Sequence, residues 1–178
     1  PLGAIHIATF GLTVVAGNWI VTLLEHQGHG QRLSGVVGGL VLFAGIVTRP
    51  LGGLAARRAP GRAWTLVGVC LVAGSAGALV LAAAPPLWVA GVAALVVGLA
   101  AGFPFAPVFA MSLRLRPDAP AAAVGFVNGC AILVILVCTP HAGPTFELPG
   151  DGRLAFLAIG LVWASALVAV RGAARPVR

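Results

Sequence analysis

Six long apolar runs, separated by short polar gaps, are the feature that most limits what this chain can fold into. A helix needs roughly 20 apolar residues to cross a membrane, and six segments meet or approach that length. They are 4–24, 33–56, 63–84, 86–112, 120–140 and 153–171. We therefore predict an all-α, polytopic membrane protein in which six transmembrane helices form one bundle over residues 1–178.

The scarcity of charged residues supports this prediction. Only 8% of the residues are charged and 60% are hydrophobic, whereas a soluble domain averages roughly 25% charged residues. A surface so poor in charge would aggregate in water, so the expected surroundings are a lipid bilayer. The net charge of +7 could indicate a nucleic-acid partner. The arginines lie in the gaps between apolar runs, however, and form no stripe along one helix, so we expect no nucleic acid.

The distribution of arginine predicts how the chain crosses the membrane. When the gaps are counted alternately, nine of the 11 arginines fall on one side: Arg49, Arg57, Arg58, Arg62, Arg114, Arg116, Arg171, Arg175 and Arg178. The other side holds only Arg32 and Arg153. Cytoplasmic loops carry the excess of basic residues, so we predict a multi-pass plasma-membrane protein with both termini in the cytoplasm.

Arg49 lies inside an apolar run rather than beyond it. If the second span covers 33–56, Arg49 is about 7 Å from its middle at a rise of 1.5 Å per residue. An arginine near the centre of a span costs roughly 2.5–3.5 kcal/mol on insertion scales. Two interpretations stay open: the guanidinium extends to the cytoplasmic interface, or it faces an aqueous cavity and binds an anionic group.

Asn18 and Asn128 also lie within predicted spans, where lipid offers an amide no hydrogen-bond partner. Each either joins neighbouring helices by hydrogen bonds or lines a cavity. His6, near the end of the first span, is expected to be solvated at the membrane interface.

Glycines and prolines predict how the helices pack. Three glycine pairs have the GxxxG spacing that lets helix backbones approach closely: Gly35/Gly39, Gly98/Gly102 and Gly125/Gly129. In the fourth span, Pro104 and Pro107 free backbone carbonyls and are expected to bend the helix.

No pattern of enzyme chemistry is found. The sequence lacks a phosphate loop, a His-Glu-x-x-His pair, a nucleophile elbow and a Cys-x-x-Cys pair. The gap "EHQGHGQR" places His26 and His29 beside Glu25, which could bind a metal, but a solvated outer loop is the favoured interpretation. We therefore predict no enzymatic activity, no cofactor and no metal.

The segment "RPLGGLAARRAPGR" resembles the loop between the second and third helices in one half of a major facilitator superfamily transporter. That loop reads Gly-x-x-x-Asp-Arg-x-Gly-Arg-Arg. Gly52 and Arg57 match it, and Ala56 stands at the Asp position. The corresponding cytoplasmic loop motif here comprises Gly52, Gly53, Arg57, Arg58 and Arg62.

Two further segments, "AAAVGFVNG" and "RLAFLAIGLVW", are similar to the beginning of that family's eleventh helix and to its last helix. The resemblance implies the C-terminal six-helix half of a secondary transporter. Such a half faces a second six-helix half and moves a small-molecule substrate by alternating access.

Within the superfamily, "ATFG" and "GIVTRPLGG" are similar to nitrate/nitrite porters, and this similarity implies that Arg49 contacts an anion. The glycine-rich signature of their eleventh helix has no counterpart in "CAILVILVCTP". The expected substrate-binding residues are Arg49, Asn128 and Asn18, with an anionic substrate favoured. The alternative is a truncated membrane bundle that does not transport and has a structural or interaction role.

Overall fold

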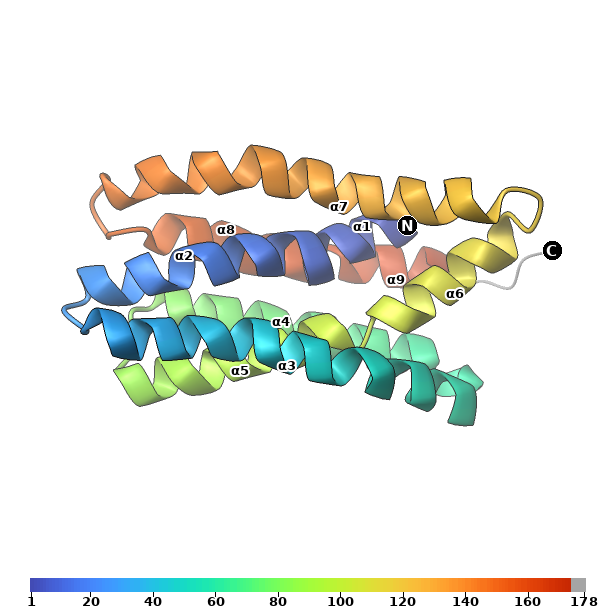
Figure 1. The fold of residues 1–178 in the computed structure, drawn as a ribbon, viewed down its shortest axis with the longest axis horizontal. Coiled ribbons are helices and arrows are strands. Elements are labelled where there is room, and N and C mark those ends of the chain that lie inside the picture. The colour runs from blue at the N-terminus through green and yellow to red at the C-terminus, as the bar shows by residue number, and fades with distance from the viewer. Residues whose placement is uncertain (174–178) are drawn as a thin grey trace.

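The computed structural model describes residues 1–173, apart from the side chain of Pro60, as long helices that run along one common axis (Figure 1). Six helical spans are long and apolar enough to cross a membrane: Leu2–His26, Gln31–Arg58, Ala63–Ala82, Leu87–Leu115, Pro120–Phe146 and Arg153–Ala173. The predicted all-α, six-span organisation is confirmed at this level. The largest difference is in the fifth span, which continues beyond residue 140 to Phe146.

Four of the spans are not uniform α-helices. The elements are α1 (Leu2–His6), the π-helix η1 (Ile7–Leu12), α2 (Thr13–His26), α3 (Gln31–Arg58), η2 (Pro60–Arg62), α4 (Ala63–Ala82), α5 (Leu87–Gly102), α6 (Phe105–Leu115), α7 (Pro120–Ala142), η3 (Gly143–Phe146), α8 (Arg153–Ser165) and α9 (Leu167–Ala173). The fourth span breaks at Phe103 and Pro104, as the prolines predicted. The sixth span breaks at Ala166, although 153–171 was expected to be one helix.

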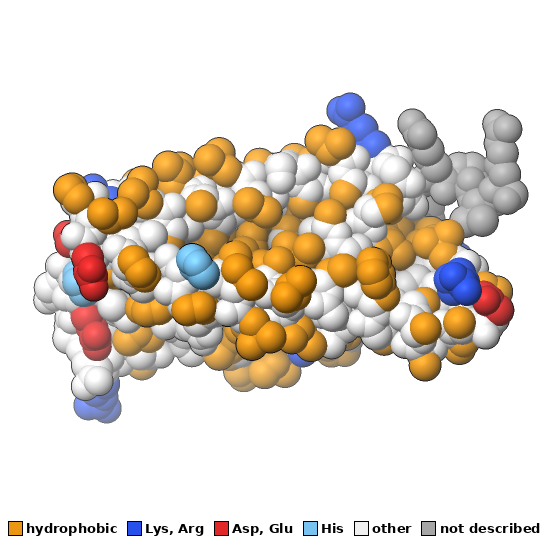
Figure 2. All heavy atoms as spheres, turned by 90° about the horizontal axis from the view of Figure 1, so that it is seen from above, with side chains coloured by type: hydrophobic (Ala, Val, Ile, Leu, Met, Phe, Trp, Pro, Cys, Tyr) orange, Lys and Arg blue, Asp and Glu red, His pale blue; other side chains and the backbone are white. Residues whose placement is uncertain are grey.

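The first span is the centre of the bundle. It packs against α3, α7 and α8, and 56% of its most apolar window is buried, against 11% for the fifth span. None of the large apolar side chains that remain exposed lies on the first span, and they include Phe43, Phe126 and Leu136, each about two-thirds exposed or more. The face in Figure 2 is accordingly apolar along its length and charged at its ends. This surface is suited to lipid and not to water.

The polar gaps collect at the two ends of the bundle. The α3–α4 and α6–α7 connections share one end with the N-terminus and α9 (Figure 1), where Pro1 lies against Gly172. Among the described residues, this end holds six arginines: Arg57, Arg58, Arg62, Arg114, Arg116 and Arg171. The opposite end holds Arg32 and Arg153. Arg175 and Arg178 lie outside the described residues, and Arg49 lies within α3 rather than in a gap.

Only one of the three predicted glycine pairs joins two helices. A Cβ atom on Gly98 would lie 2.9 Å from the Ala44 Cβ atom and 3.0 Å from the Val41 carbonyl carbon, and Gly102 is as close to Thr48. Glycine is therefore needed where α5 crosses α3. Within this chain the predictions for Gly35/Gly39 and Gly125/Gly129 are wrong, because these pairs lie on the exposed faces of α3 and α7, where an added Cβ atom would meet no other atom within 4 Å.

We expect Gly98→Ala to lower the free energy of unfolding by about 1–3 kcal/mol, because the added methyl group overpacks the α3–α5 contact. Gly129→Ala is the matched control. Its methyl group meets open space, and alanine favours a helix over glycine by about 1 kcal/mol. Denaturant unfolding in detergent micelles measures both variants, and equal losses of stability would contradict the assigned packing.

Candidate functional site

A π-helical turn in the first span shapes the centre of the bundle. Residues Ile7–Leu12 form η1 between two α-helical segments, and π turns widen the helix and are frequent at functional sites. The Thr9 hydroxyl donates a hydrogen bond to the Ile5 carbonyl at 2.9 Å. On the side toward α7, a Cβ atom on Gly11 would lie 3.1 Å from the Ala131 carbonyl oxygen. The widened turn is therefore held tightly against the fifth span.

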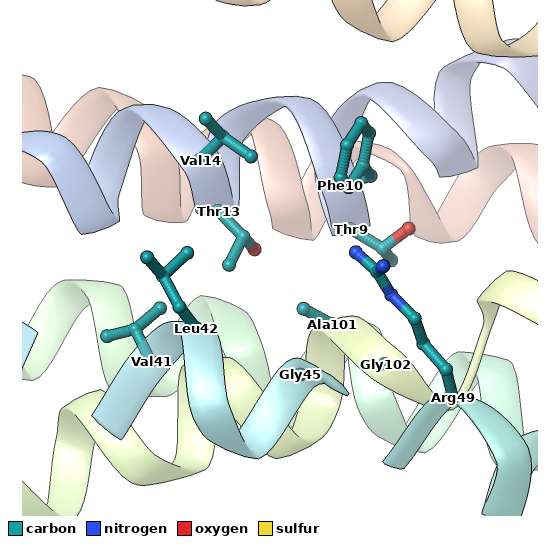
Figure 3. Close-up of a pocket in the computed structure, with 10 residues that line it drawn as sticks. All are labelled: Thr9, Phe10, Thr13, Val14, Val41, Leu42, Gly45, Arg49, Ala101 and Gly102. Atoms are coloured by element: carbon teal, nitrogen blue, oxygen red, sulfur yellow. The ribbon is translucent and has the colours of Figure 1, made fainter. Parts of the chain in front are cut away.

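The break in the fourth span places an aromatic ring next to Arg49. The close approach of Gly102 to Thr48 brings the end of α5 beside the middle of α3, and Phe105 begins α6 just beyond the break. The Arg49 Cζ atom lies 4.8 Å from the centre of the Phe105 ring and 5.4 Å from that of Phe10. Figure 3 shows the Arg49 side chain reaching from α3 toward Phe10 and Thr9.

No carboxylate neutralises Arg49. Within residues 1–173, neither Asp nor Glu comes within 4.0 Å of its guanidinium, and the four acids of the chain lie at the ends of the bundle: Glu25, Asp118, Glu147 and Asp151. Arg49 is half-buried, and cation–π contacts contribute about 0.5–2 kcal/mol depending on how far they are desolvated, which offsets part of the roughly 2.5–3.5 kcal/mol cost of the charge in a membrane. The two rings therefore stabilise Arg49 while leaving its charge available to an anion.

A cavity of about 30 Å³ adjoins Arg49 between the first, second and fourth spans. The side chains and backbone around it are those of Thr9, Phe10, Thr13, Val14, Val41, Leu42, Gly45, Arg49, Ala101 and Gly102 (Figure 3). Thr13 is 6% exposed, and its hydroxyl has no hydrogen-bond partner in the protein. A cavity of this size holds a water molecule or a small polar group. The site thus combines one cation and one free hydroxyl in apolar surroundings.

His6 contacts both Asn128 and the phenylalanine rings near Arg49. Its ring is fully buried, stacks on Phe10 at 5.2 Å and meets Phe109 edge-on at 4.9 Å. The His6 Nε2 atom lies 3.4 Å from the Asn128 Oδ1 atom and donates to it in the tautomer with a proton on Nε2. The expectation of a solvated interface histidine is therefore wrong. His6 ends α1 just before the π turn and faces Phe109 on α6 and Asn128 on α7.

The structure brings together two of the three predicted site residues. Arg49 and Asn128 contact the same cluster of His6 and three phenylalanines, Arg49 through Phe10 and Phe105 and Asn128 through His6. Neither Asn128 nor Asn18 lines the cavity, and Asn18 is exposed on α2. The adjacent Trp19 instead joins two spans, because its indole N–H donates to the Thr139 carbonyl at 2.8 Å.

The remaining members of the cluster, Phe10, Phe105 and Phe109, were not predicted. The one available signal was spacing, since His6/Phe10 and Phe105/Phe109 are pairs four residues apart that share a helix face.

The loop motif between the second and third spans divides into a packing part and an exposed part. Gly52 lies directly against the Phe103 carbonyl, and a Cβ atom on Gly53 would lie 3.4 Å from the Ala106 Cβ atom. Both glycines therefore serve the contact between α3 and the broken fourth span. Arg57, Arg58 and Arg62 are exposed.

At the opposite end of the bundle, the His26 Nδ1 atom lies 3.8 Å from the Asp151 Oδ1 atom. Among residues 1–173, no three His, Cys, Asp or Glu side chains are grouped closely enough to hold a metal ion.

Comparison with known proteins gives no assignment, because no family model matches the chain and no curated protein matches its sequence.

We expect Asn128→Leu to lower the free energy of unfolding by about 1–3 kcal/mol, since it leaves the buried His6 without a hydrogen-bond partner. Asn18→Leu makes the same substitution at an exposed position without such a partner, and no loss of stability is expected there. Unfolding of both variants in detergent distinguishes the two amides. The assignment fails if the Asn18 variant is the less stable one.

Proposed function

We propose that this bundle is one half of a secondary transporter of the major facilitator type and that it binds a small anion at Arg49. The observation that carries the proposal is an arginine within an apolar helical span that has no carboxylate from residues 1–173 beside it and adjoins a cavity between three spans. Ionisable residues inside spans usually mark a path for substrate or ions.

Binding uses the groups that the protein leaves unpaired. The planar guanidinium of Arg49 presents several N–H donors in a fixed geometry that matches a planar or tetrahedral oxyanion. The Thr13 hydroxyl supplies a further donor from the first span. The rings of Phe10 and Phe105 limit the access of water to the guanidinium, and the lower local dielectric strengthens its attraction for an anion.

Neutralisation of the Arg49 charge by a bound anion explains why the site closes only when the anion is bound. An empty site contains an unpaired cation, whose burial away from water is costly. A bound monovalent anion cancels that charge, so the loaded site can be enclosed between two apolar bundles. The substrate then stabilises the occluded conformation by its differential binding, which is the thermodynamic requirement for alternating access. In this scheme a second six-helix half supplies the other wall of the site.

We expect Arg49→Ala to reduce uptake of the transported anion by roughly 10- to 150-fold, because hydrogen bonds to a charged group contribute about 1.5–3 kcal/mol. Arg49→Lys keeps the charge but loses the planar arrangement of donors, so its rate should lie between those of the parent and the alanine variant. The measurement is uptake into proteoliposomes of the transporter that contains this chain, with a panel of small inorganic and carboxylate anions.

Arg32→Ala is the matched control, because it removes an exposed arginine from the same helix and lies outside the loop motif. It should leave uptake unchanged. If both Arg49 variants take up every anion of the panel at the parent rate, the anion site is wrong. A parent protein that moves none of these anions would favour a bundle with a structural or interaction role.

A further inference from the structure

A second basic feature lies at the arginine-rich end of the bundle, away from the Arg49 cavity. A groove of about 610 Å³ opens there between α3, α4 and α6. Arg57, on the last turn of α3, and Arg114, on the last turn of α6, both line it. Its remaining walls are small or apolar and include Ala56, Trp64 and Met111. Two cations thus border an apolar depression.

These two cations have no anionic partner. Asp118 is the one acid at this end among residues 1–173, and it is paired with Arg116 through two hydrogen bonds of 3.0 and 2.8 Å. That guanidinium lowers the pKa of the Asp118 carboxyl group, which keeps Asp118 ionised and bound to Arg116. The charges of Arg57 and Arg114 therefore remain uncompensated beside the groove.

The first turn of α4 adds uncharged donors to the same wall. Ala63 and Trp64 begin this 20-residue helix and line the groove, and the N-cap residue Arg62 gives no side-chain cap. The free N–H groups at a helix N-terminus favour an anion, especially a phosphate. The floor of the groove is apolar. A smaller apolar void of about 10 Å³ shares Ala56 and Pro107 with it.

We propose that the groove binds the headgroup of an anionic phospholipid from the surrounding leaflet. Arg57, Arg114 and the α4 N-terminus contact its phosphate, and the apolar floor contacts the adjoining glycerol and acyl chains. A soluble anion would use the cations but not this floor, whereas a phospholipid matches both. Trp64 lies at the depth where tryptophan anchors helices to the membrane interface, and basic pockets between helices are known binding sites for anionic headgroups. This proposal does not depend on the transport function.

Quenching of Trp64 fluorescence by brominated lipids tests the proposal on the purified chain in nanodiscs. Brominated phosphatidylglycerol is compared with brominated phosphatidylcholine at equal mole fraction. The same measurement on Trp64→Phe is subtracted to remove the other three tryptophans. In the parent, phosphatidylglycerol should quench the Trp64 component more strongly, and the ratio of quenching constants gives its preference.

The Arg57→Gln/Arg114→Gln variant should lose this preference by about 30-fold, as each basic residue near the surface contributes about 1 kcal/mol and 1.4 kcal/mol is tenfold. The Arg58→Gln/Arg171→Gln variant removes the same charge from exposed positions at the same end that do not line the groove, and it should keep the parent preference. Ala110→Phe keeps all four arginines but fills the groove, so quenching by phosphatidylglycerol should fall.

Three results would overturn the proposal. In the first, the two lipids quench the parent equally. In the second, both double variants lose the preference to the same extent, which would indicate general surface charge. In the third, inorganic phosphate in the buffer abolishes the preference, which would indicate a site for soluble phosphate. Because all four arginines are exposed, circular dichroism and gel filtration of the variants should match the parent.

Discussion

The positive charge of Arg49 within a membrane-spanning helix is the constraint on which the centre of this structure depends. Hydrocarbon cannot solvate a guanidinium, and no carboxylate among the described residues offsets its charge. The surrounding residues therefore stabilise the guanidinium without an opposite charge. Two aromatic faces lie at 4.8 and 5.4 Å, and a small cavity lies beside the charged group. The anion-binding proposal follows from this incomplete compensation.

Irregular backbone at two places creates that environment. The π turn at Ile7–Leu12 and the break at Phe103 and Pro104 both occur at the level of Arg49. Without the break, α5 would continue as a straight helix, and the segment that begins at Phe105 would not turn toward α3 and the first span. Departures from regular helix are tolerated in a membrane only where protein or a cavity satisfies the backbone. Because both irregular segments lie beside an unpaired cation, we regard this part of the bundle as a candidate functional site and not as a packing defect.

Sequence patterns predicted the large-scale organisation because hydrocarbon imposes a simple rule. A long apolar run must satisfy its backbone internally, so length and composition suffice to find six spans. The position of Arg49 inside the second span and the break at Phe103 and Pro104 followed from spacing and proline chemistry. The finer features depended on which way each side chain faces, and a helix that is apolar on all sides carries little information about this.

This limitation explains the particular errors. His6 and Asn18 look alike in the sequence, as single polar residues in an apolar run, yet one is fully buried and the other is exposed. The π turn alters the direction of the side chains around it, and no residue type in the sequence indicates a π turn. The glycine pairs failed for the same reason, since Gly98/Gly102 and Gly125/Gly129 have identical spacing and only the former faces a neighbouring helix.

Water access to the Arg49 cavity tests the central claim most directly. Single cysteines at Thr13, Leu42 and Ile46 can be introduced after replacing Cys70, Cys130 and Cys138, and exposed to a charged, membrane-impermeant thiol reagent in vesicles of both orientations. Such reagents modify thiols only where water reaches them. Cysteines at Thr13 and Leu42, which line the cavity, should react from at least one side, whereas a cysteine at the exposed Ile46 position, which we place against lipid, should not. Reaction at Ile46 without reaction at Thr13 and Leu42 would show that the cavity side of α3 is dry, and that the account of Arg49 is wrong.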